Sequence, residues 1–467
     1  MGGGCRNRGF PGASPAGAQV DTSAFFPSVI ACYAYLAMMS RLFLMLFVLV
    51  TVALAQETPQ AFVGGRLILI EGAEIPRGTL VVHRGKIVAV GADVAVPAAT
   101  ERHDASGKVI MPGLVDTHSH VGNVEGGDQS APMHPEVRTF DSINVRDAGI
   151  QKAQAGGITT ANIMSGSGHL LSGQTTYVKF RDGKVISDLL LYNGDGSVAG
   201  GIKMANGTNS RKKPPFPGTR AMSAALVREQ FVKAREYRDK IARASGDATK
   251  LPDRDLALEA LVEVLEGKRV VHHHTHRHDD ILTVLRLADE FGFRVVLQHA
   301  SDARFVAEEI AASGFGTSLI LIDSPGGKIE AKDNAFENGV ALERAGALVG
   351  FHTDDGITDS RLFFRQAALA VRTGMSRGAA LYGLTMAGAR MMDLEERVGS
   401  LEVGKDADFI VLSGEPLSVY TDVLESWVDG LKVFDRSDPQ DRLYAVGGYG
   451  ASHDQAHGLD HMLEEGH

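Results

Sequence analysis

Two histidines, His118 and His120, stand two residues apart directly after a short apolar run, residues 113–116. In a β-strand, residues i and i+2 point to the same side, so the two imidazoles would converge on one point. Two neutral imidazoles aimed at one point are half of a divalent metal site. The pair alone is equally compatible with two unrelated polar residues at a strand end. The metal interpretation therefore depends on further ligands downstream.

Three later apolar runs also end in residues that can bind a metal. Each run has the composition of a strand, and chance easily produces one such ending. Four endings in chain order are hard to obtain without a common centre, and the carboxyl ends of barrel strands are where parallel barrels carry their chemistry. The polar endings are His272, His273, His274 and His276 after the second run, His299 after the third, and His352, Asp354 and Asp355 after the fourth.

The histidine-rich stretch contains more imidazoles than one metal can bind. Strand alternation places His272, His274 and His276 on one side and His273 on the other. His278 follows the strand and is expected at the surface.

Short apolar runs alternate with amphipathic helical stretches between residues 113 and 395. This order is typical of an α/β protein with a (β/α)8 TIM barrel. Residues 165–200 are glycine-rich and show no helical pattern, so the third and fourth strands are the least clearly marked. The expected strands are residues 113–116, 157–163, 175–180, 201–204, 269–271, 294–297, 317–322 and 347–351; helices are expected at 221–242, 256–265, 280–291 and 303–312.

Both ends of the globular region show short alternating strands with glycine turns. Neither set is large enough to bury a face alone. We therefore expect one small β-sandwich domain built from residues 56–112 and 396–445, with the barrel inserted between its halves.

The first 55 residues are expected to be an upstream segment and a signal peptide. Arg41 precedes an apolar run, residues 42–55, that ends in an A-x-A cleavage signal. The enzyme would then be exported to the periplasm or secreted, with no stable membrane span after cleavage; an uncleaved anchor is the alternative. Cys5 and Cys32 both precede the cleavage site, so a metal would be held by nitrogen and oxygen alone.

Composition narrows the range of partners. The chain has 467 residues, 44% hydrophobic and 22% charged, as in ordinary globular proteins. Its net charge of −10 argues against nucleic acid as a partner. Residues 446–467 form a histidine-rich tail, for which a solvated segment is favoured over a metal-delivery role.

These motifs together resemble the amidohydrolase superfamily, and in particular its imidazolonepropionase-related secreted branch. The similarity covers nearly all of residues 60–435 and is specific for the superfamily, although it does not identify a substrate. The stretches that carry the resemblance are residues 109–120, 201–207, 274–281, 351–355 and 399–408, together with His299.

The resemblance implies a ligand set. His118 and His120 would bind a more buried metal, and Asp354 would complete that site; its neighbour Asp355 leaves some doubt about which carboxylate faces the metal. His274, whose place in the family pattern favours it over the adjacent histidines, and His299 would bind a second, more exposed metal. The expected ions are one or two Zn²⁺, with Mn²⁺ or Co²⁺ as alternatives.

Lys203 would bridge both metals as a carbamate formed from CO2. A carbamylated lysine is an anionic oxygen ligand, whereas a free ammonium would repel a cation. Alternatively, Lys203 pairs with a carboxylate or faces the substrate, which leaves a single metal.

The resemblance also implies a reaction. The expected activity is hydrolysis of a C–N bond in an amide, peptide or cyclic amide, by a hydroxide that a metal activates. Asp354 would act as general base and then acid, and His276 would steady the developing oxyanion. His352 and Asp355 would orient the catalytic group or contact the substrate, or would simply pack.

Candidate substrate-binding residues lie in two loops at the same end of the barrel. They are His169 in the glycine-rich loop, and Arg211 and Arg220 in the loop after the fourth strand. The cations could meet an anionic group of a small molecule or short peptide, although a solvated loop is favoured for them. A homo-oligomer is compatible with the sequence.

Three alternatives stay open. The first is a deaminase on the same scaffold, although this chain lacks the His-x-Glu pair expected of one, because Thr275 and His276 occupy that place. A lactone or ester hydrolase uses similar metals. A non-catalytic binding protein would be hard to reconcile with a full ligand set. No G-x-S-x-G motif supports a serine hydrolase.

Overall fold

The computed structural model describes residues 58–124, 126–321 and 328–447. The predicted signal peptide, Cys5, Cys32 and the histidine-rich tail beyond Gly447 lie outside these ranges. By its contacts the chain divides into two units, Met1–Ala55 and Gln56–His467, and all the described residues belong to the second.

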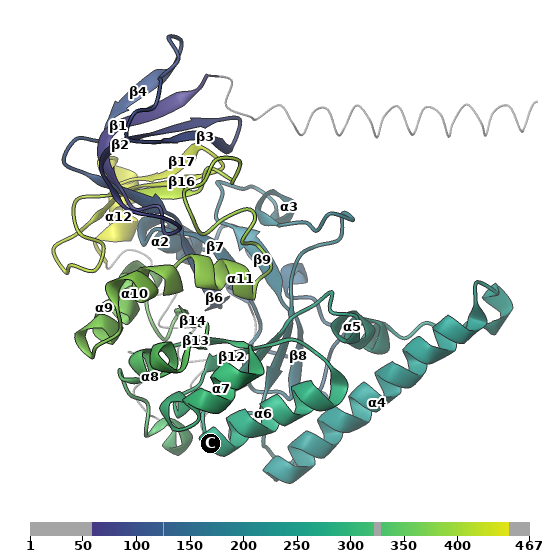
Figure 1. The fold of residues 1–467 in the computed structure, drawn as a ribbon. Helices are drawn as coiled ribbons and strands as arrows, with labels where there is room; N and C mark the ends of the chain where they lie inside the picture. Colours follow the sequence, from purple (N-terminus) through teal and green to yellow (C-terminus); the bar gives the residue numbers. More distant parts are fainter. Residues whose placement is uncertain (1–57, 125, 322–327, 448–467) are drawn as a thin grey trace, which may run out of the picture. The chain divides into compact units, whose positions relative to one another are not determined.

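Strands from both ends of this unit form one eight-stranded sheet (Figure 1). The order is β17-β16-β15-β5-β1-β2-β3, with β4 paired to β1. Antiparallel pairing of β5 with β15 joins the two ends. The strands are thus hydrogen-bonded as one sheet, and the predicted β-sandwich stays a prediction. The strands are β1 (Gln60–Leu67), β2 (Ile75–His83), β3 (Lys86–Gly91), β4 (Glu101–Asp104), β5 (Val109–Pro112), β15 (Phe409–Leu412), β16 (Val423–Val428) and β17 (Leu431–Asp435).

Strand β15 shows why this sheet packs against the rest of the unit. All four of its residues are buried. Phe409 belongs to the sheet's own core, where its ring stacks on Trp427 with centroids 5.5 Å apart. The alternate residues Ile410 and Leu412 belong to the large central core. Because successive side chains of a strand point to opposite faces, β15 packs into both cores at once.

A buried charge cluster joins the sheet to the central strands. Lys179, at the end of β9 (Thr176–Lys179), is fully buried, and its Nζ lies 2.6 Å from Asp406, 3.1 Å from Asp408 and 2.5 Å from Asp429. These carboxylates precede β15 or lie in the turn between β16 and β17. Burial would lower the pKa of Lys179, but the three carboxylates outweigh it and raise that pKa, so the ammonium stays charged.

Lys179→Met should destabilise the protein by about 3–5 kcal/mol, because it leaves buried carboxylates without their cation. Urea unfolding followed by circular dichroism measures the loss. Lys86→Met is the matched control, because Lys86 contacts the same Asp406 at 2.6 Å from a half-exposed position and should cost only about 0–1 kcal/mol. Equal losses in the two variants would show that burial of the cluster contributes nothing.

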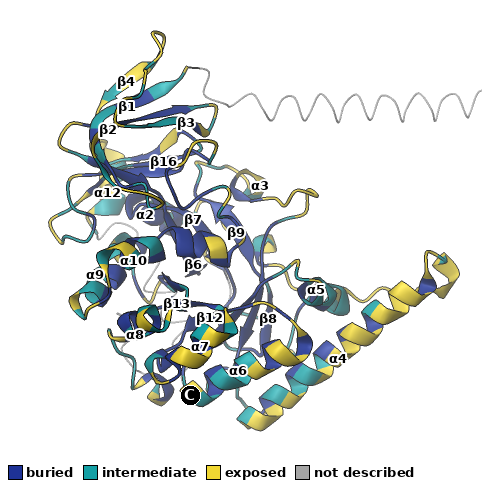
Figure 2. Ribbon diagram, in the orientation of Figure 1, coloured by how far each residue is buried: buried dark blue, intermediate teal, exposed yellow. Residues whose placement is uncertain are grey.

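The central strands fall into a six-stranded and a three-stranded sheet. The order of the first is β14-β13-β12-β11-β10-β8 and that of the second β6-β7-β9. All are almost wholly buried, as the dark strands at the centre of Figure 2 show. They are β6 (Leu114–Ser119), β7 (Ile158–Ile163), β8 (Leu171–Gln174), β9, β10 (Ile202–Ala205), β11 (Val271–Thr275), β12 (Val295–His299), β13 (Gly316–Leu319) and β14 (Val349–Phe351).

The third strand position departs from the predicted parallel pattern. From β10 to β14 all neighbours are parallel, but β9 is antiparallel to β7 and β8 is antiparallel to β10. The physical reason is the glycine-rich stretch 164–170, which contains no helix. Parallel strands need a long crossover, whereas antiparallel strands need only a short connection.

The two central sheets adjoin at both edges. Only Thr175 separates β8 from β9 in the chain, and β14 contacts β6. The hydrogen bonds assign no single closed eight-stranded sheet among the described strands, so closure into a barrel stays a prediction.

Helices cover the outside of the central strands (Figure 1). The predicted helices at 221–242, 256–265 and 280–291 are confirmed, as α4, α5 and α6. The predicted helix at 303–312 is divided by Val306 into the 3-10 helix Ala303–Phe305 and α7. The α-helices are α2 (Ala148–Ala155), α3 (Ile186–Leu189), α4 (Arg220–Ala244), α5 (Leu256–Leu265), α6 (His278–Phe291), α7 (Ala307–Ser313), α8 (Asn338–Ala345), α9 (Phe364–Arg372), α10 (Arg377–Gly383), α11 (Met386–Met391) and α12 (Pro439–Ala445).

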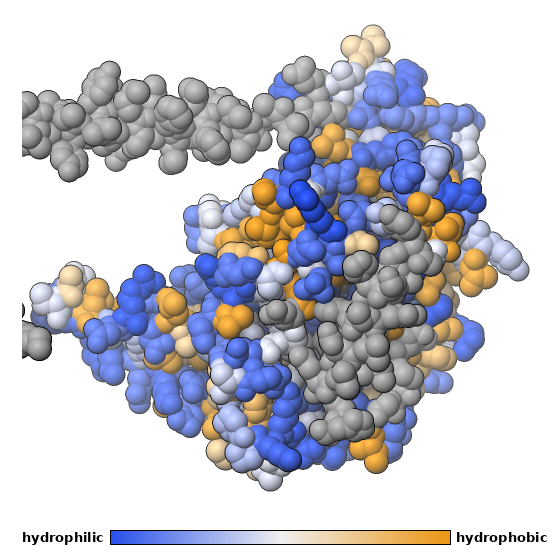
Figure 3. Space-filling model, turned by 180° about the vertical axis from the view of Figure 1, so that it is seen from behind, coloured by the Kyte–Doolittle hydropathy of each residue, from blue (hydrophilic) through white to orange (hydrophobic). Residues whose placement is uncertain are grey.

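Among the described helices the longest is α4, which is amphipathic. Val227, Phe231, Ala234 and Tyr237 form its buried stripe, and hydrophilic side chains predominate along its outer face, which extends to the left in Figure 3. Among the described residues, no helix combines the length and the apolar character needed to cross a membrane.

Candidate metal centre

His118 and His120 converge on Asp354. The Nε2 atoms of the two histidines lie 3.3 Å and 2.8 Å from Asp354 Oδ1. His120 Nδ1 lies 2.7 Å from the carbonyl oxygen of Met164. A carbonyl only accepts hydrogen bonds, so Nδ1 of His120 carries the hydrogen, and in a neutral ring Nε2 presents a lone pair to the carboxylate. The imidazole nitrogen and the carboxylate oxygen both present lone pairs, so the pair is suited to binding a shared cation.

The backbone holds Asp354 at this position. Its N–H donates to the carbonyl oxygen of His118 at 2.9 Å, and its φ of 50° lies in the left-handed region. Asp116 accepts hydrogen bonds from the backbone N–H groups of His118 and Thr353, at 3.2 and 3.1 Å. Burial raises the pKa of Asp116 to about 7. One buried carboxyl group thereby ties the end of β6 to the segment after β14.

The carboxylate of Asp355 points away from the histidines. Its Oδ2 accepts from the N–H of Ser360 at 3.2 Å. The carboxylate that the structure brings to the histidines is that of Asp354. Burial alone would raise the pKa of Asp354, but the neighbouring imidazoles, above all His118, lower it well below its usual range.

His274 and His299 lie side by side on the next face of the site, with ring centroids 4.5 Å apart. Both are 2% exposed. Within the described part of the chain, both ring nitrogens of His274 lack a hydrogen-bond partner, and so does Nε2 of His299. Burial holds the pKa of both rings well below its usual value, so both are neutral, the form that binds a metal.

Lys203 reaches the same centre from β10. Its side chain is fully buried, and its Nζ lies 3.1 Å from Nε2 of His118. Gly201, two residues earlier, leaves room for the neighbouring strand, because a Cβ there would lie 2.4 Å from the carbonyl oxygen of Val270. Short contacts therefore link the six predicted ligands in one continuous cluster, from Lys203, His120 and Asp354 around His118 to His299 and His274.

This donor set fits a divalent metal. A buried polar atom without a partner costs about 1–3 kcal/mol, and the ligand-type atoms form groups of three that lie within 4.8 Å of one another. Neutral imidazoles with a carboxylate suit zinc and similar divalent ions. The groups are His118, His120 and Asp354; His118, His299 and His352; and His274, His276 and Glu330.

His276 is buried beside His274 and His299. Its Nδ1 is 2.8 Å from Oγ of Ser301, and its Nε2 has no partner among the residues that the structure describes. Its ring stacks on that of His299 with centroids 5.2 Å apart. One nitrogen is thus anchored and the other is available to a ligand or substrate.

The other histidines of the β11 stretch take different places. His272 lies inside, between Tyr177 (2.9 Å) and Gln298 (3.1 Å). His273 points the other way, toward the cavity between α4 and α6. His278 is exposed, as predicted.

Of the three predicted substrate-binding residues, Arg220 contacts the cluster through Glu330, which is grouped with His274 and His276. For His169 and Arg211 the described residues show no such contact. His169 is buried, and neither of its ring nitrogens has a partner in the described ranges; its ring lies 5.2 Å from that of Phe216. Arg211 donates to the carbonyl oxygen of Gly207 at 3.0 Å. Arg220 is paired with Asp280 at 2.8 Å and with Glu330 at 3.2 Å, so nearby carboxylates already compensate its charge. Their role in substrate binding stays a prediction.

Sequence analysis missed Glu330. Its buried carboxylate accepts from the N–H of Thr208 at 2.8 Å and belongs to the group with His274 and His276. It lies in the 3-10 helix Ile329–Ala331, where no periodic pattern could have singled it out.

Comparisons with known proteins show which family this chain resembles. The amidohydrolase family profile matches residues 262–434. An amidohydrolase from Thermotoga maritima, solved as a crystal structure, is 32% identical with a TM-score of 0.76, covering 81% of this chain and all of that one. An imidazolonepropionase from Deinococcus radiodurans is 28% identical over 75% of this chain and 88% of its own length. The amidohydrolase tasK from Hapsidospora irregularis is 27% identical over 77% of this chain, which spans only 40% of that relative.

The solved relative is more than 30% identical to this chain, which covers its whole length. His274, His299 and Asp354 lie within the range that the family profile matches, and His118, His120 and Lys203 precede it. The protein belongs to the amidohydrolase superfamily, the hydrolases that act on C–N bonds, with imidazolonepropionases among its homologues.

Proposed function

We propose that this protein is a metal-dependent hydrolase that cleaves the C–N bond of an amide, either linear or cyclic. The observation that carries the proposal is the convergence of His118, His120 and Asp354 within hydrogen-bond distance, beside buried imidazoles whose nitrogens lack partners among the described residues. Such a cluster is costly to fold unless a cation satisfies it.

The residues divide into two sets of ligands. His118, His120 and Asp354 would hold one ion, and His274 and His299 a second, with Zn²⁺ favoured by the nitrogen-rich set. Lys203 would bridge the two as a carbamate. When bound, a divalent cation lowers the pKa of water toward about 7 and polarises a carbonyl group.

The chain's own groups would then manage protons and charge. Asp354 is a carboxylate at neutral pH, so it accepts a proton from the attacking water and passes it to the leaving nitrogen. His276, anchored by Ser301, would turn its Nε2 toward the oxygen on which negative charge develops. This second role requires the Nε2-protonated tautomer, with Nδ1 accepting from the hydroxyl of Ser301.

The position of the site supports the barrel proposal. His120 follows β6, His274 lies near the end of β11, His299 ends β12 and Asp354 follows β14. All are at the carboxyl ends of their strands, where barrels of this class carry active sites. We therefore propose that the two adjoining central sheets close into a (β/α)8 barrel.

The substrate class is open to a direct experiment. Zn-, Mn- and Co-loaded protein should be assayed against dipeptides, N-acyl amino acids and cyclic amides, including an imidazolone ring. The imidazolonepropionase relatives support the cyclic amides. The predicted signal peptide supports an exported enzyme that meets N-acyl amino acids or short peptides. Loaded protein with no turnover on any of these amides would contradict the proposed function.

Lys203→Gln should reduce the bound metal from two equivalents to one, since the amide cannot form a carbamate. Metal analysis after gel filtration measures the stoichiometry. Addition of a short carboxylic acid, which can supply the missing oxygen ligands, should restore part of the second equivalent. Unchanged stoichiometry in the variant would show that Lys203 is not a bridging ligand.

A further inference from the structure

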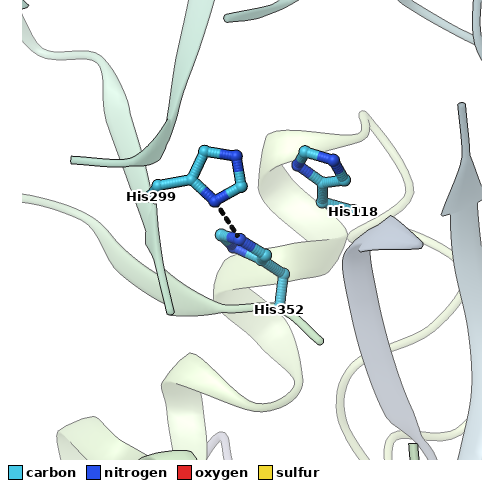
Figure 4. A group of neighbouring side chains, drawn as sticks. All are labelled: His118, His299 and His352. Carbon is cyan, nitrogen blue, oxygen red and sulfur yellow. Dashed lines mark hydrogen bonds between the residues drawn. The ribbon is translucent and has the colours of Figure 1, made fainter. Parts of the chain in front are cut away.

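Both ring nitrogens of His352 are hydrogen-bonded. His352 follows β14 and is fully buried. Its Nε2 lies 2.9 Å from Nδ1 of His299 (Figure 4), and its Nδ1 lies 2.9 Å from Oγ of Ser318 in β13. The Ser318 hydroxyl in turn lies 2.6 Å from Oγ1 of Thr117 in β6. Four buried side chains thus form one relay that ends at a predicted metal ligand.

Hydrogen-bond accounting gives this relay a direction. A neutral imidazole carries one N–H, and its other nitrogen accepts. If His352 Nε2 donated, His299 Nδ1 would accept, and His299 Nε2 would carry a buried hydrogen with no acceptor among the described residues. Such a donor costs about 1–3 kcal/mol.

The opposite direction gives both imidazole N–H groups an acceptor. His299 Nδ1 donates to His352 Nε2, His352 Nδ1 donates to Ser318 Oγ, and the Ser318 hydroxyl donates to Thr117 Oγ1. His299 Nε2 is then left with a lone pair. Asp354 does not compete for the His299 hydrogen, because its Oδ2 lies 3.9 Å from Nδ1, beyond hydrogen-bond distance.

We propose that His352, supported by Ser318, is a positioning residue that fixes His299 in the Nδ1-protonated tautomer and so presents the Nε2 lone pair to the second divalent cation. The inference rests on the proposed function in one respect: His299 must be a ligand. His352 could instead be a ligand itself, as its group with His118 and His299 would allow. Its two hydrogen bonds favour the positioning role, and the experiment separates the two.

Two substitutions of His352 distinguish its nitrogens. The amide of His352→Gln ends near the place of Nε2 and can still accept from His299. The amide of His352→Asn ends near the place of Nδ1 and can reach only Ser318. The full chain, stripped of metal, should be titrated with Zn²⁺ against a chromophoric chelator. Wild type and His352→Gln should bind the second equivalent alike, and His352→Asn about 10–100-fold more weakly.

The first equivalent should be unchanged in all variants, and Ser318→Ala should weaken the second less than His352→Asn does. His272→Asn is the matched control, since His272 is equally buried and hydrogen-bonded to Tyr177 and Gln298; it should leave both affinities unchanged. Absorption of the Co²⁺-loaded proteins gives an independent readout: the spectrum should change in His352→Asn alone.

The results of the titrations distinguish the positioning role, a ligand role of His352 and the two-ion site itself. Equal loss in the Gln and Asn variants would identify His352 as a ligand and overturn the positioning role, and retained affinity in His352→Asn would overturn it as well. Wild type that binds one equivalent or none would refute the proposed two-ion site itself. If His352→Asn does not fold, ¹⁵N NMR of histidine-labelled, metal-free wild type decides: Nδ1 of His299 should be protonated, and an unprotonated Nδ1 would overturn the proposal.

Discussion

Asp354→Asn should lower kcat by about 10³-fold while the protein stays folded. The amide cannot accept a proton from water, and general acid–base catalysis contributes about 10²- to 10⁴-fold to such reactions. Much of the metal should remain, because His118 and His120 still converge and the Asn oxygen can still bind. Steady-state kinetics at matched metal content measures the effect.

Asp355→Asn is the matched control for this variant. Asp355 is adjacent in sequence but directs its carboxylate to Ser360, and burial raises its pKa, so a neutral amide there is tolerated. Its kcat should stay close to that of wild type. Comparable turnover in Asp354→Asn and wild type would remove Asp354 from the proton-transfer step.

Removal of divalent ions should abolish hydrolysis and lower the Tm. A ligand that binds only the native state adds about 2.7 kcal/mol at a free concentration 100-fold above its Kd. Without a cation, the lone pairs of the buried imidazoles and of Asp354 face one another unsatisfied. Activity assays and scanning calorimetry after chelation, followed by addition of Zn²⁺, Mn²⁺ or Co²⁺, measure both effects.

Two controls make the metal experiment specific. Mg²⁺ prefers oxygen ligands and should not restore activity at this nitrogen-rich site. His278→Ala should behave as wild type, since His278 is exposed and lies 3.3 Å from Asp302, outside the cluster. Full activity in thoroughly chelated protein would contradict the metal-dependent mechanism.

The sequence predicts most of the candidate centre because the ends of apolar strands can be recognised from the residue pattern. His118 and His299 lie at the ends of buried strands, and His120 and Asp354 follow such strands. Parallel strands bring such endings to one edge of the sheet. The residue type and its position along the strand therefore suffice to place these residues together. The family pattern adds Lys203, which spacing alone would not have distinguished from a buried partner of a carboxylate.

Other features depend on contacts that no local pattern encodes. The antiparallel third strand follows from the lack of a crossover helix after β7, which strand propensity does not report. Lys179 pairs with carboxylates more than two hundred residues away in the chain. For His352, alternation along the strand suggests a side but not the partners, Ser318 and His299, that lie on two neighbouring strands.

The pairing of β5 with β15 has a consequence for biosynthesis. An edge strand without a partner is a template for intermolecular association. During translation β5 emerges roughly three hundred residues before β15, so its outer edge stays uncovered until β15 has been made. Truncation before Phe409 would expose that edge permanently and remove Ile410 and Leu412 from the central core. The terminal strands therefore close the structure, and nascent or shortened chains are the forms most prone to aggregate.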